Sequence, residues 1–125
     1  MLEKDHILVV DENDDTRELV TRLVERDFFE ADVASFAWPG AALEFAASHS
    51  VRLLIANGNM PAMNGGLLVR EMRERTPGLP VIVVAGDAEV SERAAALGAD
   101  RFLLQRRLAF DLPDCVRTLL TRAAK

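Results

Sequence analysis

The chain has 125 residues, of which 50% are hydrophobic and 28% charged, a size and balance typical of one globular domain. Its net charge of −5 and isoelectric point near 5.0 argue against nucleic acid as a primary partner, because phosphate binding needs a basic surface. The single cysteine, Cys115, excludes an intrachain disulfide, and no apolar run approaches the length of a membrane span, so we expect one cytoplasmic domain over residues 1–125 without a membrane contact.

The hydrophobic pattern alternates between strand and helix from the start of the chain. His6–Val10 is a short continuous apolar run, as expected of a strand covered on both faces. Helical spacing over 14–27 is followed by a short strand at 31–35 and a helix of small residues at 39–49. A third strand is predicted at Arg52–Ala56.

The second half of the chain continues this alternation. The segment 76–80, TPGLP, is a strong breaker between two periodic regions. The elements predicted here are a helix at Gly65–Arg75, a strand at Val81–Val84, a helix at Glu89–Leu97 ended by Gly98, a strand at Arg101–Leu104, and a helix at 112–123 with Pro113 near its first position.

Strands that alternate with helices predict an α/β fold with a parallel sheet and helices on both faces. Ligands of such sheets bind beyond the carboxyl ends of the strands. The residues that end the strands are therefore the candidate functional residues. They are Asp11 and Glu12 after the first strand, Asn57 after the third, Ala85 after the fourth and Gln105 after the fifth.

Four segments at these strand ends resemble, in order and spacing, the landmarks of the response-regulator receiver domain. They are HILVVDEND, LLIANGNMPAMNG, VIVVAGDA and AAALGADRFLLQR. The resemblance covers essentially the whole chain. It implies a flavodoxin-like sheet in the order 2-1-3-4-5 and a place in bacterial two-component or phosphorelay signal transduction.

In the receiver family, an acid pair after the first strand binds Mg²⁺, and an Asp at the end of the third strand takes a phosphoryl group from a histidine kinase. A Thr or Ser after the fourth strand and a Lys-Pro after the fifth complete that site. The resemblance assigns the metal position to Asp11, Glu12 and Asn59, the phosphoacceptor position to Asn57, the Thr or Ser position to Ala85, the Lys-Pro positions to Gln105 and Arg106, and the switch aromatic to Phe102.

Asn57 cannot serve as the family's nucleophile, because an amide oxygen is neutral and too weak to accept a phosphoryl group. Ala85 also lacks the hydroxyl and Gln105 lacks the ammonium of the family site. A glutamine at position 105 can hydrogen-bond an amide instead. The sequence thus predicts a site that is stable without phosphate, binds Mg²⁺ weakly at most, and has no enzymatic activity.

Three functional hypotheses follow. The first is a pseudo-receiver, a phosphorylation-independent module that binds a histidine kinase, another regulator or an output protein. The second is a conventional receiver, phosphorylated after Asn57 deamidates next to Gly58 or on another carboxylate such as Asp87. The third is a small-molecule-binding flavodoxin-like domain. This hypothesis is disfavoured because the acidic residues after the first strand would repel anionic cofactors and no Gly-rich phosphate loop follows that strand.

Arginines make the last third of the chain basic, which predicts either a solvated face or a protein contact such as a homodimer. They are Arg101, Arg106, Arg107, Arg117 and Arg122. The peptide bond between Gln105 and Arg106 is expected to be trans, because a cis bond before a residue other than proline costs about 3–4 kcal/mol.

Several candidate residues also have simpler structural explanations. Asn57-Gly58 is typical of a hairpin turn, although no alternating strand follows it. Cys115 lies in an apolar helical pattern and is predicted to be a core thiol rather than a catalytic one. His6 and His49 have no second ligand at metal spacing and are expected to be structural or solvent-facing.

Overall fold

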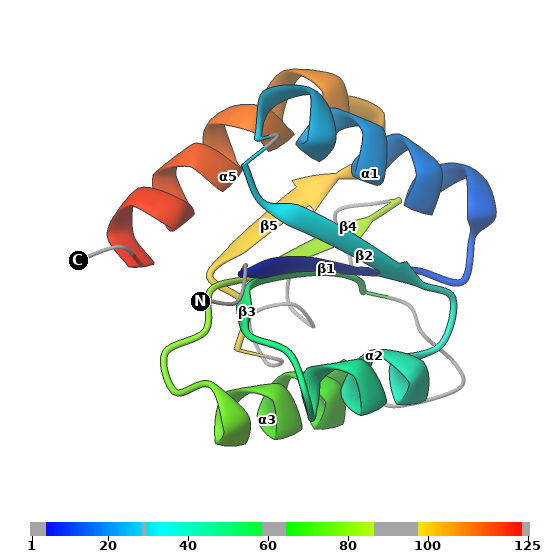
Figure 1. The fold of residues 1–125 in the computed structure, drawn as a ribbon. Helices are drawn as coiled ribbons and strands as arrows, with labels where there is room; N and C mark the ends of the chain where they lie inside the picture. Colours follow the sequence, from blue (N-terminus) through cyan, green and yellow to red (C-terminus); the bar gives the residue numbers. More distant parts are fainter. Residues whose placement is uncertain (1–4, 29, 59–64, 87–97, 124–125) are drawn as a thin grey trace.

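The protein, described here by a computed structural model, folds around one five-stranded sheet (Figure 1). The structure describes residues 5–28, 30–58, 65–86 and 98–123. The sheet is parallel in the order β2-β1-β3-β4-β5, as predicted. Its strands are β1 (His6–Val10), β2 (Asp32–Phe36), β3 (Val51–Asn57), β4 (Val81–Ala85) and β5 (Arg101–Leu104).

Helices cover both faces of the sheet (Figure 1). One face is covered by α1 (Asp14–Asp27) and α5 (Leu108–Ala123), and the other by α2 (Pro39–Ala46) and α3 (Gly65–Arg75). Side chains alternate between the two faces along β3. Leu53 belongs to the core under α1 and α5, whereas Leu54 belongs to the core under α2 and α3. Both leucines are fully buried, which explains the continuous apolar run of this strand.

The strand register places the predicted site residues side by side. Val10 pairs with Ala56, so Asp11 follows β1 next to Asn57, the last residue of β3. Asn57 in turn pairs with Val84, one residue before Ala85 ends β4. Because β3 and β4 are parallel neighbours, Asn57-Gly58 does not form a hairpin turn between them.

Gly98 shows why a glycine is needed before β5. Its φ angle is +84°, in the left-handed region that side chains other than glycine rarely adopt. A Cβ atom at this position would lie 2.9 Å from Nη1 of Arg73. That guanidinium nitrogen donates a hydrogen bond of 2.7 Å to the Gly98 carbonyl, so α3 is fastened to the chain entering β5. The helix predicted at Glu89–Leu97 lies outside the described residues.

The start of the last helix differs from the prediction. A 3₁₀ helix, η1 (Gln105–Arg107), leads directly into α5, which begins at Leu108 rather than at residue 112. Pro113 therefore lies inside α5. The helix continues through Pro113 because Leu108 and Leu112, one turn apart, are both 1% exposed and fix this turn against the sheet.

The end of α2 also differs, since this helix stops at Ala46 rather than at residue 49. The N–H of Ser48 bonds to the carbonyl of Phe45 in a tighter turn. Nδ1 of His49 lies 2.9 Å from the same carbonyl. The imidazole therefore hydrogen-bonds a carbonyl that a backbone N–H would bond if the helix were longer. The other described elements begin and end within one residue of the prediction.

Candidate functional site at the carboxyl edge of the sheet

A buried carboxylate and a side-chain amide meet at the carboxyl edge of β1 and β3. Nδ2 of Asn57 donates a hydrogen bond of 2.9 Å to Oδ1 of Asp11. Asp11 is 3% exposed, and a carboxylate this deeply buried needs hydrogen-bond donors in place of water. Asn57 provides one of these donors, which an ionised carboxylate at the same position could not do.

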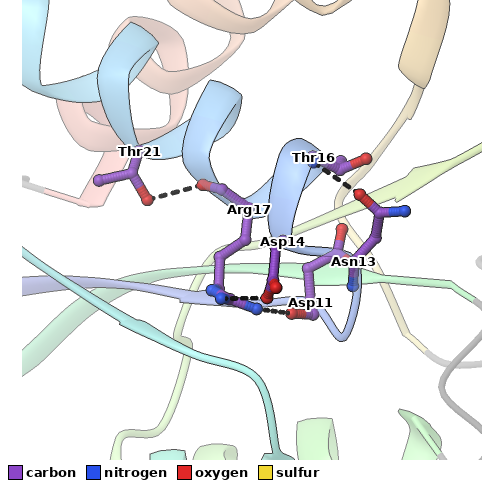
Figure 2. A network of polar contacts seen from close by, with 6 residues as sticks. All are labelled: Asp11, Asn13, Asp14, Thr16, Arg17 and Thr21. Atoms are coloured by element: carbon purple, nitrogen blue, oxygen red, sulfur yellow. Dashed lines mark hydrogen bonds and ion pairs between the residues drawn. The ribbon is translucent and has the colours of Figure 1, made fainter.

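The start of α1 provides further contacts to Asp11 (Figure 2). The backbone N–H of Asn13 donates to the same Oδ1 atom at 2.9 Å. Nη1 of Arg17 donates to the backbone carbonyl of Asp11 at 2.8 Å, and Nη2 donates to the carboxylate of Asp14. Asp11 is therefore held by β3 through Asn57 and by α1 through Asn13 and Arg17.

The N-terminus of α1 is capped beside this site. Oδ1 of Asn13 accepts a hydrogen bond of 2.9 Å from the N–H of Thr16, as Figure 2 shows. Asp14 and Asp15, in the first turn, are exposed and lie where the helix dipole favours negative charge. The acid-rich segment is thus a helix start, and Asp11 is its buried member.

Glu12 has a buried carboxylate oxygen, Oε1, that, unlike Oδ1 of Asp11, accepts no hydrogen bond from the described residues. An unsatisfied carboxylate oxygen next to Asp11 fits a hard cation such as Mg²⁺, which takes oxygen ligands. No three acids, histidines or cysteines in the described part of the chain are grouped closely enough to hold a metal, and Asn59 lies outside that part. Asp11 and Glu12 are therefore the residues that would hold the ion.

The family model named "Response regulator receiver domain" matches residues 7–111. The chain belongs to this family. The match includes both Asp11 and Asn57, so the contact between their side chains lies within a receiver domain. No helix among the described residues of this receiver domain has the length and apolar content to cross a membrane.

Curated relatives extend the comparison. The receiver domain is 34% identical over 119 residues to the response regulator MprA of Mycobacterium ulcerans, covering 93% of this chain and 50% of the relative. It is 31% identical over 121 residues to the aerobic respiration control protein ArcA of Escherichia coli, covering 94% and 49%. The chain thus spans about half the length of these relatives.

Solved structures share the fold of this receiver domain. A CheY-like response regulator receiver domain protein from Methanospirillum hungatei superposes with a TM-score of 0.83 at 22% identity, covering 98% of each chain. The receiver domain of a LuxO repressor protein from Vibrio parahaemolyticus gives 0.80 at 20% identity, covering 97% of this chain and 93% of that one. These similarities confirm the CheY-like, flavodoxin-like architecture.

Ala85, which ends β4, and Gln105, which follows β5, add neither a hydroxyl nor a hydrogen bond to this site. Ala85 is 2% exposed and presents only a methyl group. The hydrogen bond that Gln105 could make to an amide is not formed within the described part of the chain, where the Gln105 side chain is exposed. The reason is that η1 begins at Gln105 and turns this residue to the surface.

Phe102 and Arg106, the predicted switch and interface residues, differ in their exposure to solvent. Phe102, on β5, is partly buried and packs against the core under α2 and α3. Arg106 is exposed on η1, and the peptide bond that joins it to Gln105 is trans, as predicted. Arg101, Arg107 and Arg117 are also exposed, so a protein or homodimer contact on this face stays a prediction. Asp87 lies outside the described residues.

Two features of the receiver domain escaped the sequence reasoning. The first is the hydrogen bond from Arg17 to the backbone carbonyl of Asp11. The sequence features that indicate it are the helix cap Asn13 and the i,i+3 spacing of Asp14 and Arg17, which places Arg17 on the side of the helix that faces Asp14. The rings of His6 and His49 lie 5.2 Å apart, a proximity that no local pattern indicates.

Cys115 is partly buried against the core under α1 and α5. Burial raises the pKa of its thiol, and the positive charge of Arg101 opposes this rise only in part. A raised pKa keeps the group protonated and weakly nucleophilic near neutral pH. The structure therefore supports a core thiol at Cys115 rather than a catalytic one.

Proposed function

We propose that this receiver domain is a phosphorylation-independent protein-interaction module of two-component signalling, without enzymatic activity of its own. The observation that supports this most strongly is the hydrogen bond from Asn57 to Asp11. Asn57 ends β3, and the sequence resemblance assigns this position to the family's phosphoacceptor Asp. An amide there supplies a donor and removes the nucleophile.

The charge of the site supports the same proposal. A carboxylate at position 57 would put two negative charges within hydrogen-bond distance in a buried site, an arrangement that needs a cation or a proton. The Asn57 amide replaces this repulsion with an attraction to Asp11. Mg²⁺ held by Asp11 and Glu12 would neutralise carboxylate charge, and we propose that its binding is weak and not required for the folded state.

The surroundings offer little to a phosphoryl group. Stabilising one requires donors or positive charge aimed at its oxygens. Ala85 has no hydroxyl, and Gln105 has no ammonium and faces solvent. The two groups with which the family holds the phosphoryl group are thus both absent at their positions in this chain.

Signalling through this domain would then depend on binding alone. Receiver domains interact with histidine kinases or output domains, and we propose a histidine kinase, another regulator or an output protein as the partner. A ligand shifts a conformational equilibrium only by its differential affinity for the two states. Without a phosphoryl group, the concentration and affinity of the partner would set the signal.

The test is the intact mass of the protein after incubation with acetyl phosphate and Mg²⁺, beside the variant Asn57→Asp. A conventional receiver domain in the same tube controls for active reagent. We expect no phosphoryl adduct on the wild-type protein. An adduct on the wild type would overturn the proposal, and peptide mapping would then distinguish deamidated Asn57 from another carboxylate such as Asp87.

A further inference from the structure

We propose that a cavity at the amino edge of the sheet binds a small monocarboxylate with an apolar body. The cavity has a volume of about 490 Å³, within the range of small-molecule sites in proteins. Two arginines, two acids and two large apolar residues provide most of its lining: Arg52, Arg117, Asp27, Glu30, Phe28 and Leu120.

The position of the cavity separates it from the Asp11–Asn57 site. Arg52 lies at the start of β3, whereas Asn57 is the last residue of that strand. The cavity lies between the end of α1, the start of β3 and the last turns of α5. In Figure 1 these segments lie on the side of the two chain termini, away from the loop that joins β1 to α1. A ligand there would touch both α1 and α5 without reaching Asn57.

Arg52 is the positively charged residue of the lining that is best placed to bind an anionic ligand. Its side chain is partly buried on β3 and lines the cavity. Within the described part of the chain it forms neither a hydrogen bond nor an ion pair. A guanidinium presents paired N–H donors whose geometry matches the two oxygens of a carboxylate.

Arg117, on α5, provides a second guanidinium to the lining of the cavity. It lies 5.8 Å from the centroid of the Phe28 ring and pairs with Asp114 at 2.7 Å. The Asp114 side chain is 85% exposed, and exposed ion pairs of this kind are weak enough to exchange for a ligand. A carboxylate that contacts both Arg52 and Arg117 would therefore have charge-assisted donors from two elements.

The lining also indicates the rest of the ligand. Leu120 is 9% exposed and Phe28 packs against the same core, so together they offer an apolar wall next to the guanidinium groups. Asp27 and Glu30 add negative charge at the same cavity and would repel a second anionic group. These features favour one carboxylate on an apolar body over phosphates, nucleotides and polycarboxylates.

The test is a titration of the ¹⁵N-labelled protein with phenylacetate, followed by amide chemical shifts. We expect saturable shifts at Phe28, Ala31, Arg52 and Thr121. The neutral isostere phenylacetamide should bind at least about tenfold more weakly, because a hydrogen bond to a charged group is lost. Arg52→Gln should weaken phenylacetate binding by a similar factor, whereas Arg70→Gln, an exposed arginine on α3, should leave it unchanged.

Several outcomes would overturn this proposal. They are an absence of saturable shifts at the cavity, equal binding of phenylacetate and phenylacetamide, and shifts centred on Asn13 and Asn57 at the other edge. Full affinity in Arg52→Gln would do the same. The amide spectrum of each variant shows whether it is folded, and Arg117→Gln provides the same comparison if Arg52→Gln does not fold. None of these results depends on phosphorylation of the receiver domain.

Discussion

Position 57 ends a buried strand beside the buried carboxylate of Asp11. A side-chain amide there can donate a hydrogen bond to Asp11, whereas a carboxylate would have to share a cation or a proton with it. In the structure, Nδ2 of Asn57 donates this hydrogen bond to Oδ1 of Asp11 over 2.9 Å. The same Oδ1 also accepts the N–H of Asn13. Together, the two donors compensate the desolvation of this oxygen without a metal ion.

We therefore expect Asn57→Asp to make the stability of the receiver domain depend on magnesium. In EDTA the free energy of unfolding should fall by about 1–3 kcal/mol, because a buried hydrogen bond is replaced by repulsion between carboxylates. Added Mg²⁺ should restore part of this loss. Urea unfolding with EDTA or with MgCl₂ measures both quantities.

Asn57→Ala is the matched control for this prediction. It removes the same hydrogen bond without adding a charge, so it should also be destabilised but should respond less to Mg²⁺ than Asn57→Asp. Equal stability of wild type and Asn57→Asp in EDTA would show that the amide does not stabilise this site.

Among the elements, α5 shows how a local rule and tertiary packing can disagree. Proline is favoured in the first turn of a helix, which led to a predicted start at residue 112. In the structure, burial of Leu108 and Leu112 extends the helix toward its N-terminus and leaves Pro113 inside it. Pro113 has no N–H to donate to the carbonyl of Ala109. Because Ala109 is exposed, water can hydrogen-bond that carbonyl instead.

This arrangement predicts that Pro113→Ala stabilises the protein. A helix-interior proline costs about 3 kcal/mol relative to alanine, and the lost rigidity of the unfolded chain and lost packing offset part of that gain. We expect the free energy of unfolding to rise by about 1–2 kcal/mol in urea titrations.

Pro39→Ala gives the opposite case in the same molecule. Pro39 is the first residue of α2 and is buried, so its removal should lower stability. If Pro113→Ala were destabilising as well, Pro113 would have to be stabilising through its packing rather than straining α5.

At the scale of the whole molecule, the sequence could predict which strand ends lie together, but not how individual side chains are directed. Asp11 and Asn57 follow or end two apolar strands whose carboxyl ends share one edge of the sheet. The hydrophobic pattern of these strands is therefore enough to predict that the two residues lie close together. The cavity that Arg52 and Arg117 help to line depends on how side chains from β3 and α5 are directed, which periodicity does not specify. The position of Gln105 depended on η1, which has no distinct hydrophobic pattern.

The two faces of the sheet hold separate hydrophobic cores that share the same strands. The core under α1 and α5 includes Leu53 and Ile55, and the core under α2 and α3 includes Leu54 and Ala56. Each strand therefore couples the two helical layers through its backbone. Loss of packing on one face should weaken the sheet that the other face requires.

Leu53→Ala and Leu54→Ala test this coupling with the same chemical change on opposite faces. Each removes a fully buried side chain and should lower the free energy of unfolding by about 2–5 kcal/mol. In both variants we expect one urea transition by circular dichroism, and a matching fall in hydrogen-exchange protection in α3 and α5, because the shared sheet makes unfolding cooperative. Protection lost in α5 alone for Leu53→Ala, and in α3 alone for Leu54→Ala, would show instead that the two layers unfold independently.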